Sequence, residues 1–221
     1  MRTRIKFCGL VRPEDVDTAV ALGVDAVGFV FYPESPRYLE AGQAASLRRR
    51  LPSYVCSVGL FVNEPATRVR ETARQVGLDV MQFHGDETPE YCAGTMANHT
   101  AYWKAVRMRS AGDLLESLAR FGAAEALLLD SFSEGFGGSG RRFDWSWIPQ
   151  QRGMPLVMSG GLDASTVGEA IDAVRPMAVD VSSGIQGSDA RTKDRAKMER
   201  FVAAVIAADA GQLTDGARSD Q

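Results

Sequence analysis

Eight short apolar runs, each followed by an amphipathic stretch, constrain the fold of this 221-residue chain more than any other feature. We expect strands at residues 5–9, 26–31, 55–62, 80–85, 102–108, 126–131, 155–161 and 178–184. Apolar residues recur at helical spacing in residues 13–22, 40–51, 64–76, 88–96, 111–121, 144–151, 164–174 and 193–208. Strands that alternate with helices in this way form right-handed crossovers and a parallel sheet.

The number of these units favours a closed (β/α)8 TIM barrel, a single α/β domain over residues 1–209, because that fold uses eight units in roughly 250 residues. The alternative is an open doubly wound sheet, which is the weaker interpretation because no GxGxxG follows the first strand. Residues 210–221 are small and polar, and we expect them to form a flexible C-terminal tail.

The composition limits which partners and which cellular compartment we expect for this chain. The net charge of −3 gives no sign of a nucleic-acid partner. No apolar stretch has the length needed to span a membrane, and the first residues lack the apolar core of a signal peptide. The three cysteines show no CxxC spacing, which favours free thiols over a metal site or a disulfide framework. We therefore expect a cytoplasmic protein.

Polar side chains gather where the predicted strands end. Cys8 closes the first strand, Arg37 follows the second, His84 closes the fourth and Asp130 the sixth. In a TIM barrel the active site lies at the carboxyl ends of the strands. The sequence therefore predicts an active site at that end of the barrel.

Small residues end the last two predicted strands, as Ser159-Gly160-Gly161 and Ser182-Ser183-Gly184. The loops after these two strands are the usual phosphate site of a TIM barrel, and small residues let an anion approach backbone N–H groups. A third glycine-rich stretch, residues 134–143, follows the sixth strand. Each stretch alone could be an ordinary turn, but the three together favour a phosphate ligand.

Cys8 and Asp130 lie on strands that can face each other across the mouth of the barrel. A thiolate can take a proton from carbon, and a carboxylic acid can give one to oxygen, which is isomerase chemistry without a metal or organic cofactor. The alternatives are core packing for Cys8 and a helix cap or ion pair for Asp130. For Arg37 the alternatives are a bidentate contact with a substrate carboxylate or a surface ion pair. For His84 they are ligand contact or a structural hydrogen bond.

Eight motifs in order resemble the phosphoribosylanthranilate isomerase family. They are "KFCGL" (6–10), "DAVGFVFYPESPRY" (25–38), "VGLFVN" (58–63), "QFHGDE" (82–87), "LLLDS" (127–131), "GFGGSGRRFDW" (135–145), "SGGL" (159–162) and "DVSSGIQ" with a later "KD" (180–194). The resemblance runs from about residue 4 to residue 205. It implies a cofactor-free barrel that performs an Amadori rearrangement of a small phosphoribosyl substrate in tryptophan biosynthesis, most often as a monomer.

The resemblance also implies roles for individual residues. Cys8 matches the family's general base and Asp130 its general acid. Arg37 would face the anthranilate carboxylate, while His84 and Asp180 would line the pocket. The residues implied to bind the phosphate are Gly160, Gly161, Ser183 and Gly184. The chain departs from the usual family pattern at Ser139, Ser159 and Gln186.

Three other functions compete with this one. The related isomerase of histidine biosynthesis pairs two aspartates at the first and fifth strands, where this chain has Cys8 and "KAVR". Indole-glycerol-phosphate synthase relies on lysines at strand ends, but Lys104 falls within the fifth strand and no matching lysine ends the third. A catalytically silent phosphosugar-binding barrel would have no need of both Cys8 and Asp130.

Overall fold

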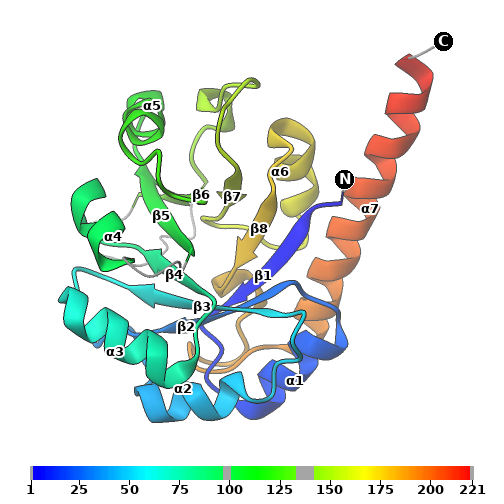
Figure 1. Ribbon diagram of the computed structural model, residues 1–221. Coiled ribbons are helices and arrows are strands. Elements are labelled where there is room, and N and C mark those ends of the chain that lie inside the picture. Colours follow the sequence, from blue (N-terminus) through cyan, green and yellow to red (C-terminus); the bar gives the residue numbers. More distant parts are fainter. Residues whose placement is uncertain (1, 97–100, 133–141, 220–221) are drawn as a thin grey trace.

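The computed structural model describes residues 2–96, 101–132 and 142–219, with side chains to residue 212. Its parallel strands pair in chain order, and the last closes on the first, so the sheet is a closed barrel and not an open doubly wound sheet (Figure 1). The strands are β1 (Arg4–Cys8), β2 (Ala26–Val30), β3 (Cys56–Phe61), β4 (Val80–Phe83), β5 (Ala101–Met108), β6 (Ala126–Ser131), β7 (Leu156–Met158) and β8 (Ala178–Val181). The predicted (β/α)8 barrel is confirmed.

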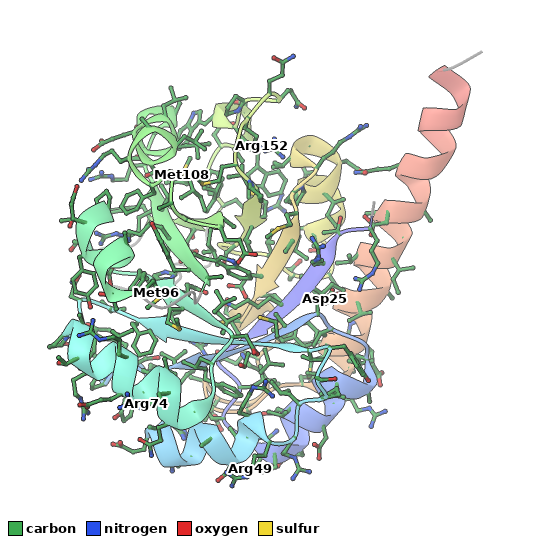
Figure 2. The ribbon with its side chains drawn as sticks, viewed as in Figure 1. Asp25, Arg49, Arg74, Met96, Met108 and Arg152 are labelled. Atoms are coloured by element: carbon green, nitrogen blue, oxygen red, sulfur yellow. The ribbon has the colours of Figure 1, made fainter. Side chains whose placement is uncertain are left out.

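Helices surround this barrel on the outside (Figure 1). They are α1 (Pro13–Ala21), α2 (Ala41–Arg48), α3 (Ala66–Val76), α4 (Pro89–Thr95), α5 (Ala111–Arg120), α6 (Val167–Val174) and α7 (Arg195–Ser219), with 3-10 turns η1 (Trp145–Trp147) and η2 (Ser183–Ile185). Charged side chains such as Arg49 and Arg74 project from the outer surface (Figure 2). No helix within the described residues is long and apolar enough to cross a membrane.

The helix expected over residues 144–151 is reduced to the short turn η1. Ile148, which follows η1, has φ −91° and ψ 116°, an extended conformation. The residue before a proline is driven out of the helical region by the proline ring, and Pro149 follows directly. The helical spacing of apolar residues therefore continues to residue 151, but the backbone cannot stay helical at Ile148.

The last helix is longer than the stretch of helical spacing, residues 193–208, indicates. α7 continues through Ser219, so residues 210–219 are helical. Asp209 ties this helix to the start of β1, because its carboxylate accepts hydrogen bonds from Thr3 N at 2.8 Å and from Thr3 Oγ1 at 2.7 Å. Gln212 Nε2 donates to Ile171 O on α6 at 3.1 Å. Flexibility beyond residue 209 stays a prediction.

Two groups of buried apolar residues hold the barrel together. The larger one lies between the strands and the helices and includes Phe7, Leu114 and Phe201. The smaller one contains only strand residues, such as Val58, Leu128 and Val157, and fills the inside of the barrel. Side chains alternate in direction along a strand, so every second residue points inward. At the carboxyl ends of the strands most inward positions carry polar residues, such as Cys8, Gln82, Asp130 and Asp180, while Val30 and Leu60 are apolar.

Candidate active site

A cavity of about 640 Å³ opens at the carboxyl ends of the strands. Eight of the nine residues predicted for the site line it: Cys8, Arg37, His84, Asp130, Gly160, Gly161, Asp180 and Ser183. The ninth, Gly184, is not among the lining residues. A methyl group on it would lie 2.1 Å from Leu162 O. Gly184 thus lets the loop after β8 pack on the loop after β7. The roles of all nine toward a substrate stay predictions.

Asp130 is the penultimate residue of β6, and its carboxylate is nine-tenths buried and held on both oxygens. Ser131 N donates to Oδ1 at 2.9 Å, and His84 Nε2 lies 3.2 Å from Oδ2. Gln82 Nε2 lies 2.8 Å from His84 Nδ1, so the amide donates to that nitrogen and leaves the imidazole proton on Nε2, facing Asp130. Three strand-end residues therefore form one chain of hydrogen bonds that ends at the carboxyl group.

Cys8 ends β1 and has Gly28 of β2 as its partner in the sheet. A methyl group at Gly28 would lie only 2.9 Å from Cys8 Sγ, so the glycine clears the space that the sulfur occupies. Burial raises the pKa of the Cys8 thiol, while the charges of Lys6 and Lys193 lower it and that of Asp180 raises it. Cys8 lines the cavity despite this burial.

Arg37 reaches the cavity from the loop after β2. Its Nη2 donates to Gln186 Oε1 at 2.7 Å, a neutral partner. Its Nε is buried without a hydrogen-bond partner among the described residues. Gly9 has φ +70°, and a methyl group on it would lie 2.4 Å from Arg37 Cδ, so the glycine makes room for this arginine. The guanidinium is therefore placed to receive an anion.

Gly160 affects the surroundings of Asp130 as well as the loop after β7. Its φ of +81° is one that residues with a side chain rarely adopt. A methyl group on it would lie 2.5 Å from Ser131 N and 3.0 Å from Asp130 Oδ1. Ser159, one of the departures from the family pattern, donates from Oγ to Asp180 Oδ2 at 3.5 Å.

Sequence reasoning missed two lysines beside Cys8. Lys6, two residues before it, is 1% exposed and donates from Nζ to Asp180 Oδ1 at 2.8 Å. Lys193 donates from Nζ to Ser182 O at 2.9 Å, and burial together with the charge of Arg37 lowers its pKa to about 8. The signal was present, because both lysines belong to motifs that carry the family resemblance.

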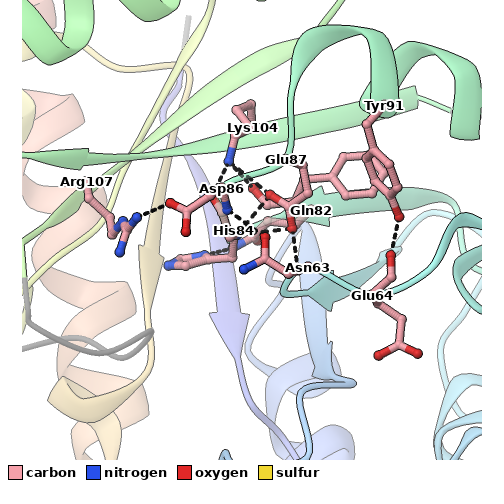
Figure 3. A network of polar contacts seen from close by, with 11 residues as sticks. Asn63, Glu64, Gln82, His84, Asp86, Glu87, Tyr91, Lys104 and Arg107 are labelled. Carbon is pink, nitrogen blue, oxygen red and sulfur yellow. Dashed lines mark hydrogen bonds and ion pairs between the residues drawn. The ribbon is translucent and has the colours of Figure 1, made fainter.

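Lys104 does not reach the cavity, which weakens any interpretation of it as a catalytic lysine. Its Nζ donates to Gly85 O at 2.7 Å and to Glu87 Oε2 at 3.1 Å, and Glu87 in turn accepts from Asn63 N and Gly85 N (Figure 3). Asn63 Oδ1 accepts from Asp86 N at 2.8 Å, which ties the loop after β3 to the loop after β4. This buried network holds the loop that follows His84.

The third glycine-rich stretch, residues 134–143, lies outside the described residues except for its last two positions, and so does Ser139. Within the described parts of the chain, no three His, Cys, Asp or Glu side chains gather as metal ligands do.

Comparison with known proteins identifies a family whose model this chain matches. Residues 5–204 match the model of the family described as N-(5'phosphoribosyl)anthranilate (PRA) isomerase. The N-(5'-phosphoribosyl)anthranilate isomerase of Ralstonia nicotianae is 53% identical over 219 residues, 95% of each chain. The enzyme of the same name from Dechloromonas aromatica is 51% identical, over 95% of this chain and 99% of its own.

Solved structures of phosphoribosyl anthranilate isomerases also match this chain. A crystal structure of phosphoribosyl anthranilate isomerase from Thermotoga maritima matches with a TM-score of 0.86 and 39% identity, over 93% of this chain and 99% of that one. A second, in complex with reduced 1-(o-carboxyphenylamino)-1-deoxyribulose 5-phosphate, matches with a TM-score of 0.83, 37% identity and the same coverage.

Proposed function

The chain belongs to the family of N-(5'-phosphoribosyl)anthranilate isomerases, and we propose that Cys8 and Asp130 are the base and the acid of its reaction. It is an isomerase of tryptophan biosynthesis, which converts N-(5-phospho-β-D-ribosyl)anthranilate into 1-(2-carboxyphenylamino)-1-deoxy-D-ribulose 5-phosphate. The observation that carries the residue assignment is the shared cavity: a thiol and a carboxyl group line it from β1 and β6.

The acid acts first. Asp130, in its protonated form, gives a proton to the ring oxygen of the ribose, and the C1′–O bond breaks to leave a Schiff base between C1′ and the anthranilate nitrogen. His84 holds Asp130 Oδ2, and the backbone N–H of Ser131 holds Oδ1. With both oxygens held, the carboxyl group stays aimed at one point in the cavity. This fixed placement supplies the orientation that general acid catalysis needs.

The base acts second. Cys8 as thiolate removes the C2′ proton, and the electron pair of that bond moves toward the positive nitrogen to give an enol-amine. Transfer of the enol proton to C1′ then yields the ketone at C2′. No atom is gained or lost, because C1′ is reduced and C2′ is oxidised within one molecule. Proton exchange with water restores Cys8 and Asp130 for the next turnover.

The two anionic ends of the substrate need separate partners. Arg37, whose Nε is buried and unpaired among the described residues, is suited to the anthranilate carboxylate. The loops after β7 and β8 would take the phosphate on the backbone of Gly160, Gly161, Ser183 and Gly184, as phosphates bind in many barrels of this kind. His84 and Asp180 would contact the substrate between these ends.

Two coarser properties complete the proposal. We infer a cytoplasmic enzyme, consistent with free thiols at Cys8, Cys56 and Cys92. We infer a monomer, although one solved relative is described as monomers generated from a dimeric isomerase. Sedimentation at micromolar concentration would decide the second point.

The test is turnover. Phosphoribosylanthranilate, generated in situ from anthranilate, loses its fluorescence as it is isomerised. We expect Cys8→Ala and Asp130→Asn each to lower kcat by about 100-fold or more, the usual contribution of a general acid or base, while KM changes little. Cys56→Ala is the matched control, because Cys56 lies on β3 away from the cavity. Near-normal kcat in Cys8→Ala would exclude the thiol as the base.

A further inference from the structure

Lys6 is a charged residue inside the barrel that the reaction as described leaves without a role. It lies two positions before Cys8 on β1, so both side chains point inward. Its side chain is 1% exposed, and its Nζ donates to Asp180 Oδ1 at 2.8 Å. Burying an ion pair costs several kcal/mol per ion before the pairing is counted. An apolar side chain would fill the same space without that cost.

Gly28 brings Lys6 and Cys8 together. It pairs with Cys8 in the sheet, and a methyl group on it would lie 2.9 Å from Cys8 Sγ and 3.2 Å from Lys6 Cε. The end of the lysine chain and the sulfur therefore flank the same empty position on β2. A larger residue there would separate the ammonium group from the thiol.

We propose that Lys6 is a positioning residue for the base: its buried ammonium group, oriented by Asp180, stabilises the thiolate form of Cys8. The proposal rests on the function proposed above, in which Cys8 removes a proton from the substrate. Charges interact far more strongly in a protein interior than in water. An ammonium group beside the sulfur therefore favours the thiolate.

Each charged group around Cys8 either raises or lowers the pKa of its thiol. Burial is the largest influence and raises the pKa of Cys8; Lys6 is the largest opposing one, and Lys193 also lowers that pKa. Asp180, on β8, raises it. Without Lys6, burial and Asp180 would act together against the thiolate. The two partners of the ion pair thus act on Cys8 in opposite directions.

The test is a titration of the thiol without substrate. In a Cys56→Ala/Cys92→Ala background, Cys8 is the one remaining thiol. The rate of its alkylation by iodoacetamide and the ultraviolet absorbance of its thiolate are followed against pH. We expect Lys6→Met to move the midpoint upward by about one pH unit or more, which is about tenfold slower alkylation at a fixed pH below it.

Two further variants separate this effect from a general loss of structure. Asp180→Asn should move the midpoint downward, opposite to Lys6→Met. Lys104→Met is the matched control, because Lys104 is a second buried lysine in the barrel wall, paired to Glu87 at 3.1 Å, and lies away from the cavity. It should leave the midpoint unchanged. Midpoints that shift alike in all three variants would overturn the proposal.

Lys6→Gln guards against a Lys6→Met protein that does not fold, because the amide is neutral and can still donate to Asp180. A folded Lys6→Gln with the wild-type midpoint would also overturn the proposal. The outcome is independent of the function assigned to Cys8. If Cys8→Ala kept full turnover, the base assignment would fail, while the substrate-free titration would still decide whether Lys6 stabilises the thiolate.

Discussion

His84 Nε2 lies 3.2 Å from Asp130 Oδ2 and joins the ends of β4 and β6 across the mouth of the barrel. Gln82, two residues before His84, fixes the direction of this contact from the other ring nitrogen. The imidazole therefore orients the carboxyl group through this contact. The loop that follows His84 is held by the buried network around Lys104 and Glu87 (Figure 3).

The first prediction concerns this contact. We expect His84→Ala to lower kcat by up to about 100-fold, because a loss of about 1 Å in placement can cost that much. KM should change less, since the carboxylate and phosphate partners remain. Steady-state kinetics at a fixed pH would measure the split. Gln82→Leu is the graded comparison and should have a smaller effect in the same direction. A His84→Ala protein with unchanged kcat would show that Asp130 needs no such partner.

The second prediction concerns the stability cost of Lys193. Its pKa falls from 10.5 to about 8 in the folded protein, chiefly through burial. The folded state therefore disfavours the ammonium form, so stability should rise as the pH goes from about 8 to 10.5 and be lowest below that window. Replacement by Met removes this cost but also loses the hydrogen bonds from Nζ to Ser182. We expect Lys193→Met to be more stable at pH 7 by about 1–3 kcal/mol.

Urea unfolding of wild type and Lys193→Met at pH 7 and again near pH 10.5 would check this, and the difference should shrink at the higher pH. The same variant should bind the anionic substrate more weakly, because a cation beside Arg37 is lost. Gain of stability with loss of affinity is the pattern of a residue kept for function. Lower stability at pH 7 would contradict the prediction.

The sequence predicts the barrel and the inward polar residues because both follow from local periodicity and strand ends. Cys8 and Asp130 each close an apolar run, and the topology brings such ends to one rim. The role of Lys6 depends on Asp180, 174 positions later, and on the missing side chain at Gly28. No local pattern reports such pairings. The short turn η1 departs from the expected helix for a local reason, because Pro149 holds Ile148 in an extended conformation although the apolar residues around it have helical spacing.

The third prediction separates two roles of Gly160. If the residue served only the phosphate, Gly160→Ala would raise KM. The added methyl group would instead lie 2.5 Å from Ser131 N and 3.0 Å from Asp130 Oδ1, so the acid must shift as well. We therefore expect kcat to fall at least as much as KM rises. Kinetics of Gly160→Ala beside Gly161→Ala give the comparison, and a pure KM effect in Gly160→Ala would contradict it.

The fourth prediction concerns the buried pair of Lys104 and Glu87, whose side chains are 6% and 2% exposed. Removing one member leaves the other charge buried and unpaired, which typically costs about 3–5 kcal/mol. Lys104→Met and Glu87→Leu should each lose stability of that order in urea unfolding. The double variant should lose less than the sum of the two, because it leaves no unpaired charge.

The same cycle measured by turnover tests what the pair does for the site. The loop that carries Gly85 and Glu87 begins directly after His84, and Lys104 holds it through the Gly85 carbonyl and the Glu87 carboxylate. If this anchor positions His84, the single variants should lower kcat along with stability. The double variant, although it recovers part of the lost stability, should keep a reduced kcat. Its Gly85 N and Asn63 N have both lost the Glu87 carboxylate that accepts their hydrogen bonds. Full recovery of kcat in the double variant would show that the pair serves folding alone.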